Sequence, residues 1–104
     1  MAIHKINSDD NGSRITIVDG DIIIIELPEN PTTGYMWIPK GLKAEQITEK
    51  SNNYTLTNTG IGSGGIRTFE FIMKKGQEGN IILENMQKWS NDIYQTFQLN
   101  YTFE

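Results

Sequence analysis

The chain is organised around one short segment, Asn30-Pro31-Thr32-Thr33-Gly34-Tyr35-Met36-Trp37. Pro31 fixes its own φ at about −65° and keeps Asn30 out of the helical region. Gly34 adopts a positive φ at little cost, so the chain can turn sharply there. The two threonines have stiff χ1 angles because they are β-branched. A rigid, uncharged loop that is followed at once by Tyr35 and Trp37 is typical of a surface presented for binding.

The segments on either side of this loop are predicted to be β-strands. Residues 21–27 contain four consecutive isoleucines and are apolar enough to be buried on both faces of a sheet. Residues 14–18 are rich in β-branched side chains, and Asp19-Gly20 predicts a tight turn between these two runs. Together they predict a hairpin. After the loop, residues 35–38 predict a strand that ends at Pro39.

The second half of the chain carries the clearest strand patterns. Residues 66–73 and 95–103 alternate between apolar and polar side chains, as half-buried strands do. Shorter strands are predicted at residues 54–57 and 80–83. Residues 42–50 fit either one helical turn or a short strand, because their composition favours a helix but their length does not. The apolar faces of the two alternating strands consist of Phe69, Phe71 and Met73, and of Phe97, Leu99, Tyr101 and Phe103.

These elements predict an all-β fold. About seven short strands separated by turns are typical of a β-sandwich, and polar alternation fits antiparallel sheets with one face in water. A length of 104 residues corresponds to a single domain with one core. Residues 1–13 are polar and rich in turn formers, so we expect a flexible arm or an edge strand there.

The composition argues against an enzyme, a cofactor and a metal site. The chain has no cysteine, which excludes disulfides, thiolate metal ligands and a cysteine nucleophile. Its one histidine, His4, lies in the expected arm, so a serine nucleophile would have no paired base. Residues 7–18 resemble the beginning of a calcium loop, but Val18 stands where that loop needs a bidentate glutamate. We therefore expect no catalytic residue and no bound cofactor.

Charge and hydropathy exclude two further classes of partner. The formal net charge is −4 and the lysines are scattered, so no basic surface for nucleic acid or for an anionic membrane is predicted. The longest apolar run has four residues, too short for a membrane span. No signal-peptide core is visible at the start. A cytoplasmic monomer is expected, or a lysosomal or secreted protein if a leader has been removed.

Residues 30–37 resemble the signature loop of the chagasin-type inhibitors of papain-like cysteine peptidases. The match specifies seven of eight positions, and at average residue usage its chance frequency is on the order of one in a billion. The family's second motif, Gly-x-Gly-Gly, is similar to Gly62-Ser63-Gly64-Gly65 between two predicted strands. Its third motif, Arg-Pro-Trp, corresponds here to Gln87-Lys88-Trp89, which keeps the aromatic residue and loses the guanidinium and the proline. The resemblance covers residues 14–104.

The resemblance implies an immunoglobulin-like β-sandwich with three binding loops at one end. It also implies reversible, competitive and tight-binding inhibition, in which the first loop covers the catalytic cysteine and histidine and the other two grip the walls of the cleft. The residues implied to contact the peptidase are Asn30, Pro31, Thr32, Thr33, Gly34 and Tyr35, then Ile61, Gly62, Ser63, Gly64 and Gly65, and finally Gln87, Lys88 and Trp89. Because lysine lacks the planar fork of arginine and the proline is absent, we expect the third loop to contribute less than in typical relatives.

Several alternatives remain open from the sequence. Trp37 is favoured as a core residue over a contact residue, and Asn30 could cap its own loop instead of touching an enzyme. Residues 62–65 could be a flexible connector. Trp89 could lie on a short helix that packs inward, since residues 84–88 are compatible with a helix. The alternative function is a β-sandwich adhesion or ligand-binding module that keeps a similar loop for structural reasons.

Overall fold

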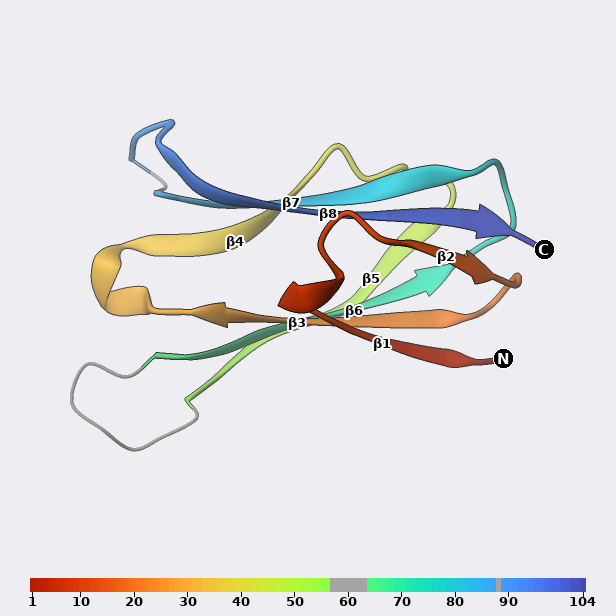
Figure 1. Cartoon of the computed structure of the whole chain (residues 1–104), viewed down its shortest axis with the longest axis horizontal. Helices are drawn as coiled ribbons and strands as arrows, with labels where there is room; N and C mark the ends of the chain where they lie inside the picture. Colours follow the sequence, from red (N-terminus) through yellow and green to blue (C-terminus); the bar gives the residue numbers. More distant parts are fainter. Residues whose placement is uncertain (57–63, 88) are drawn as a thin grey trace.

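The computed structural model describes residues 1–56, 64–87 and 89–104 and shows an all-β sandwich of two four-stranded sheets (Figure 1). The described residues form eight strands where the sequence predicted about seven. No helix in the described part of the chain is long and apolar enough to span a membrane. The strands are β1 (Ile3–Asn7), β2 (Arg14–Ile17), β3 (Ile22–Glu29), β4 (Tyr35–Lys40), β5 (Ile47–Leu56), β6 (Gly65–Met73), β7 (Gly79–Gln87) and β8 (Ile93–Phe103).

One sheet has the strand order β1-β3-β6-β5 and the other has the order β2-β8-β7-β4. β1 pairs with β3, and β2 pairs with β8, in parallel; the remaining neighbours are antiparallel. Two short 3₁₀ helices, η1 (Ser8–Asp10) and η2 (Pro31–Thr33), lie in connections between strands. Because β3 and β4 belong to different sheets, the segment around η2 carries the chain from one layer of the sandwich to the other.

The predicted hairpin of residues 14–27 is wrong. β2 and β3 enter different sheets, so the turn at Asp19-Gly20 joins the two layers instead of two paired strands. Gly20 has a positive φ of 89°, as the turn prediction required, but its N–H donates to the carbonyl of Met73 in β6. The turn residues therefore predicted the chain reversal correctly. They did not predict the partners of β2 and β3, because a tight turn does not determine which strands become neighbours.

Other strand limits also differ from the prediction, including β7, which continues to Gln87 beyond the predicted residues 80–83. β4 continues through Pro39 to Lys40, which is tolerated because β4 is the edge of its sheet and one side of it has no ladder to donate to. β5 runs through the predicted turn at residues 51–53, with a bulge between Glu49 and Ser51. An extra residue at a bulge bends a strand without ending it, so three polar residues remain in the ladder.

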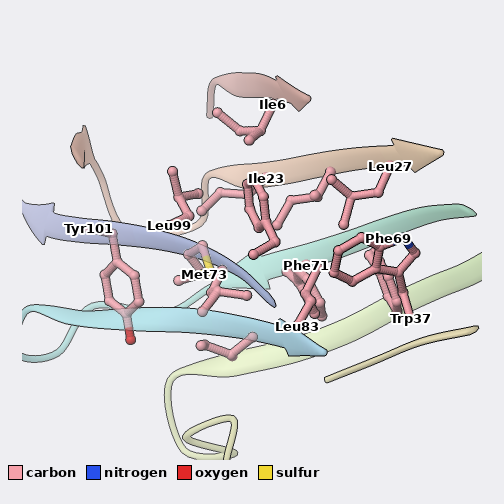
Figure 2. Close-up of a cluster of buried hydrophobic side chains, with 14 of the residues drawn as sticks. Ile6, Ile23, Leu27, Trp37, Phe69, Phe71, Met73, Leu83, Leu99 and Tyr101 are labelled. Carbon is pink, nitrogen blue, oxygen red and sulfur yellow. The ribbon is translucent and has the colours of Figure 1, made fainter. Parts of the chain in front are cut away.

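The core lies between the two sheets and is built from the alternating apolar residues (Figure 2). Phe69, Phe71 and Met73 of β6 are fully buried, as predicted, and the rings of Phe69 and Phe71 stack with their centroids 5.7 Å apart. Trp37 is only 4% exposed, so the structure confirms it as a core residue. Its indole N–H donates to the carbonyl of Pro28 at 2.9 Å, which satisfies its one polar group.

The N-terminal strand β1 is attached to the sandwich through the buried carboxylate of Asp21. His4 Nε2 lies 2.9 Å from Asp21 Oδ2, and the backbone N–H groups of Ala2 and Val18 donate to the same carboxylate at 2.8 and 2.9 Å. The hydrogen bond to His4, followed by the backbone bond from Ala2, lowers the pKa of Asp21 to about 2. These bonds favour the ionised carboxylate in the folded state.

We expect this arrangement to make the fold sensitive to acid. A carboxylate whose folded pKa is lowered stabilises the fold above its unfolded value near 3.8, and this stabilisation, about 2 kcal/mol, is lost as pH falls through about 2. Urea unfolding of the wild type and of Asp21→Asn between pH 6 and pH 2 measures the effect. The wild type should lose more stability than the variant across this range. Identical slopes for both proteins would contradict the assignment.

Candidate loop surface

β3, β5 and β7 all finish at one end of the sandwich, which we call the loop end (Figure 1). We call residues 30–34 the first loop, residues 57–64 the second loop and residues 88–92 the third loop. The register places the ends of their flanking strands together, since Glu29 and Leu56 are both paired with Gly65, and Tyr35 is paired with Gln87. Both chain termini lie toward the opposite end (Figure 1).

The first loop is stabilised by its own side chains. Asn30 Oδ1 accepts hydrogen bonds from the backbone N–H of Thr32 at 3.1 Å and from its hydroxyl at 2.7 Å. The hydroxyl of Thr33 donates to the carbonyl of Asn30 at 2.8 Å. The local caps expected for asparagine and threonine therefore form, and they hold η2 as a tight turn. Asn30 acts within the loop, as one of the sequence alternatives proposed.

Gly34 ends the first loop with a positive φ of 81°. The indole ring of Trp89 lies directly against it: a Cβ on Gly34 would overlap Trp89 Cη2. Trp89 nevertheless remains 73% exposed, so its ring covers Gly34 with part of its surface and presents the rest to solvent. The alternative that placed Trp89 on an inward-packing helix is wrong, because residues 84–87 belong to β7 and Trp89 is exposed.

Further contacts join the first loop to the third loop and to the start of β8. Gln87 Nε2 donates to the carbonyl of Thr33 at 3.4 Å. The hydroxyl of Tyr35 donates to Asp92 Oδ2 at 2.5 Å, and this bond raises the pKa of Tyr35 above its ordinary value. The ring of Tyr35 also packs against that of Tyr94, with 5.5 Å between the centroids. The end of the first loop is therefore fastened to a neighbouring strand pair.

Of the second loop, the structure describes only the last residue, Gly64, which is followed by Gly65 at the start of β6. A Cβ on Gly64 would come within 2.5 Å of the carbonyl oxygen of Glu29, so only glycine lets this backbone lie against the first loop. A Cβ on Gly65 would overlap the carbonyl oxygen of Thr55 in β5. These two glycines are packing positions, not a simple spacer. The predicted contact residues Ile61, Gly62, Ser63 and Lys88 lie outside the described residues.

A buried ion pair lies beneath the first loop. Arg67 Nη2 donates to Glu29 Oε2 at 2.7 Å, and the Glu29 side chain is only 1% exposed. The backbone N–H of Trp37 donates to Glu29 Oε1 at 2.8 Å. Arg67 also donates to Asn52 Oδ1 and lies over the ring of Tyr54, 5.5 Å from its centroid. This network ties β3, β4, β5 and β6 together just below the loops.

The structure thus brings the described members of the three motifs to one surface. Three residues of this surface lie outside the family motifs. Asp92 and Tyr94 contact Tyr35, and Leu56 is 72% exposed at the end of β5. The alternation of residues 95–103, extended backwards, would have placed Tyr94 in β8. The part of the chain that the structure describes contains no cluster of three or more acidic or histidine residues suited to a metal ion.

Residues 16–101 match the chagasin family of peptidase inhibitors, I42. The chain belongs to this family. The prediction of the family from the sequence is confirmed, together with its all-β fold and its class as an inhibitor and not an enzyme. The described residues of the three family motifs lie at the loop end.

Three relatives illustrate the similarity. The chain is 30% identical to chagasin of Trypanosoma cruzi over 92 residues, which cover 84% of each chain. The crystal structure of EhICP2, a cysteine protease inhibitor from Entamoeba histolytica, superposes with a TM-score of 0.86 at 20% identity, over 100% of this chain and 97% of that one. The solution structure of amebosin gives a TM-score of 0.79 at 27% identity, over 100% and 99% of the two chains. The whole sandwich is therefore shared.

Proposed function

We propose that this chain inhibits papain-like cysteine peptidases reversibly and competitively by inserting the loop end into the active-site cleft. The observation that supports this most strongly is the packing of Trp89 on Gly34, which joins the signature loop to the third motif in one surface. Family membership supplies the class of target. Of the residues predicted to contact the enzyme, Thr32, Thr33 and Tyr35 lie on this surface together with Trp89.

The first loop suits a narrow cleft because its described side chains are small or neutral and its shape is fixed before binding. Thr32 and Thr33 are held by Asn30, so they lose little conformational freedom when an enzyme closes around them. The predicted rigidity of this loop thus has a physical cause in the structure. Preorganisation of this kind raises affinity by lowering the ordering cost.

The backbone of the first loop also explains how an inhibitor could avoid being cut. Residues 31–33 form a 3₁₀ turn instead of an extended strand, so their peptide bonds do not follow the path of an extended substrate. Pro31 in addition lacks the N–H that an extended substrate would offer to the enzyme. We propose that the loop fills the cleft without presenting a bond in a reactive geometry.

A titration of papain and of a cathepsin with the purified protein, followed with a fluorogenic substrate, tests this function. We expect stoichiometric loss of activity that returns on dilution, with an apparent inhibition constant that rises with substrate concentration. Undiminished turnover of both enzymes at micromolar excess would instead favour the alternative of an adhesion or ligand-binding module.

Trp89→Ala tests the third loop. Removing the indole uncovers Gly34 and deletes an exposed aromatic anchor, so we expect the inhibition constant to rise by about tenfold. Val18→Ala removes an exposed apolar side chain at the opposite end and should leave inhibition unchanged. Both variants are assayed against several papain-like enzymes. If Trp89→Ala inhibits all of them as well as the wild type does, the third loop has no role in binding.

A further inference from the structure

The third loop is joined to the first loop region by two side-chain hydrogen bonds. Gln87 Nε2 donates to the carbonyl of Thr33 at 3.4 Å. The hydroxyl of Tyr35 donates to Asp92 Oδ2 at 2.5 Å. The residues held in this way, Thr33 and Tyr35, are separated only by Gly34. The two bonds therefore attach the third loop on both sides of that glycine.

Trp89 covers Gly34 between these two attachments. It lies between Gln87 and Asp92 in the chain, and its ring packs where a Cβ on Gly34 would be. Because the side chain is 73% exposed, it buries little apolar surface and gains little from the contact itself. The position of the indole therefore depends on the bonds at either end of the loop.

Polar bonds also close the third loop on itself. Ser90 Oγ donates to Gln87 Oε1 at 3.1 Å and accepts from the backbone N–H of Asp92 at 3.4 Å. The backbone N–H of Gln87 donates to the carbonyl of Asp92 at 3.4 Å. The family motif has arginine and proline where this chain has Gln87-Lys88. The loop that was expected to be loosened by their absence thus has attachments of another kind.

The bond between Tyr35 and Asp92 is the stronger of the two attachments. Its acceptor is a carboxylate, and hydrogen bonds to ionised groups are shorter and stronger than those between neutral groups. Tyr35 is also a fixed anchor, because it begins β4 and its ring packs against that of Tyr94 with 5.5 Å between the centroids. The exposed Asp92 side chain therefore ties the third loop to a residue that strand pairing already holds.

We propose that Asp92 positions Trp89 on Gly34 by holding the third loop to Tyr35, so that the indole is in place before a peptidase binds. Asp92 is a positioning residue, and its effect on inhibition rests on the proposed function. Apparent affinity rises with the fraction of molecules that already have the binding-competent shape. The bond thus compensates in part for the absent arginine and proline.

Asp92→Ala, Asp92→Asn and Tyr35→Phe are compared with the full-length wild type in two measurements. The position of the indole in the free protein is followed by the ring-current shift of the Gly34 α protons, taken relative to Trp89→Ala. The inhibition constant against papain is measured with a fluorogenic substrate. In Asp92→Ala and in Tyr35→Phe we expect the shift to fall and the inhibition constant to rise by the same factor, about threefold, because both follow the fraction of molecules with the indole in place. Asp92→Asn should recover most of this loss, since its amide oxygen still accepts from Tyr35.

Glu78→Ala is the control for charge, because it removes an exposed carboxylate at the opposite end and should change neither measurement. Adding Tyr35→Phe to Asp92→Ala should cause no further loss, since the two residues act through one bond. Three results would overturn the proposal: an unchanged shift in Asp92→Ala, a changed shift with an unchanged inhibition constant, or an effect of Asp92→Ala that persists in full when Tyr35→Phe is already present. If the wild type inhibits neither papain nor a cathepsin, the proposed function fails, while the shift still decides whether Asp92 positions the indole.

Discussion

Replacing Gly34 with valine is expected to raise the inhibition constant against papain by at least about 100-fold. Gly34 has a φ of 81°, a conformation that is costly for any β-branched residue. Its Cβ would also overlap the ring of Trp89. The loop and the indole therefore cannot both keep their positions, and the shape that enters the cleft is lost. The inhibition constant of the variant is measured with a fluorogenic substrate.

Gly20→Val is the matched control for this change. Gly20 has a nearly equal φ of 89°, but a Cβ there would meet nothing within 4 Å, and the turn lies at the end opposite the loops. Both variants should lose about 1–2 kcal/mol of unfolding free energy through backbone strain. Only Gly34→Val should lose inhibition. If Gly34→Val inhibits papain as strongly as Gly20→Val does, the first loop is not a contact surface.

Arg67→Ala is expected to lower the free energy of unfolding by about 3–5 kcal/mol. The Glu29 carboxylate is 1% exposed and would lose its counter-charge while remaining buried. Removing one member of a buried ion pair is costly because the other is left uncompensated in a medium of low polarity. Urea unfolding followed by tryptophan fluorescence reports this loss, since Trp37 donates its backbone N–H to the same carboxylate.

Arg14→Ala provides the comparison for this second prediction. Arg14 and Glu78 form an ion pair 3.6 Å long whose side chains are 63% and 71% exposed, so removing it should change stability by less than about 1 kcal/mol. A double variant, Arg67→Met with Glu29→Leu, should recover part of the loss because no unpaired charge remains. If Arg67→Ala lowers the free energy of unfolding no more than Arg14→Ala does, the buried network does not stabilise the fold.

Alternation predicted the strands well where one face of the sheet is buried. Phe97, Leu99 and Tyr101 alternate with polar residues, and the structure buries all three in the core. The pattern gave no information on which strands become neighbours, because side chains report the face of a strand and not its partner. The mistaken hairpin of β2 and β3 follows from this limit.

The alternating pattern of β3 and β6 indicates that Glu29 and Arg67 face inward, but it does not show that they pair. Glu29 continues the inward-facing series of Ile23, Ile25 and Leu27, and Arg67 precedes Phe69 on the inward face of β6. Opposite charges at two inward positions indicate a buried pair. Glu29 and Arg67 come together only because β3 and β6 pair in the register that aligns Leu27 with Arg67. That register is set by the tertiary fold.

The loop surface was predictable in part. The motifs indicated Gly34, the paired glycines and Trp89, because their residue types are tied to backbone shape and to exposed aromatic anchors. No family motif contains Asp92 or Tyr94, and their contacts with Tyr35 depend on the tertiary arrangement of the loops. The sequence therefore specified the first loop itself, and the structure added the residues that hold it in place.

The most direct test of the account is amide hydrogen exchange in the complex of this protein with papain. We expect exchange to slow by at least about tenfold in residues 30–35 and 89–94, because amides buried in a complex open less often. The turns at residues 19–21 and 74–78 lie at the other end and should exchange as in the free protein. Protection at those turns or along β5, with the loops unprotected while papain is inhibited, would contradict the claim that the loop end occludes the cleft.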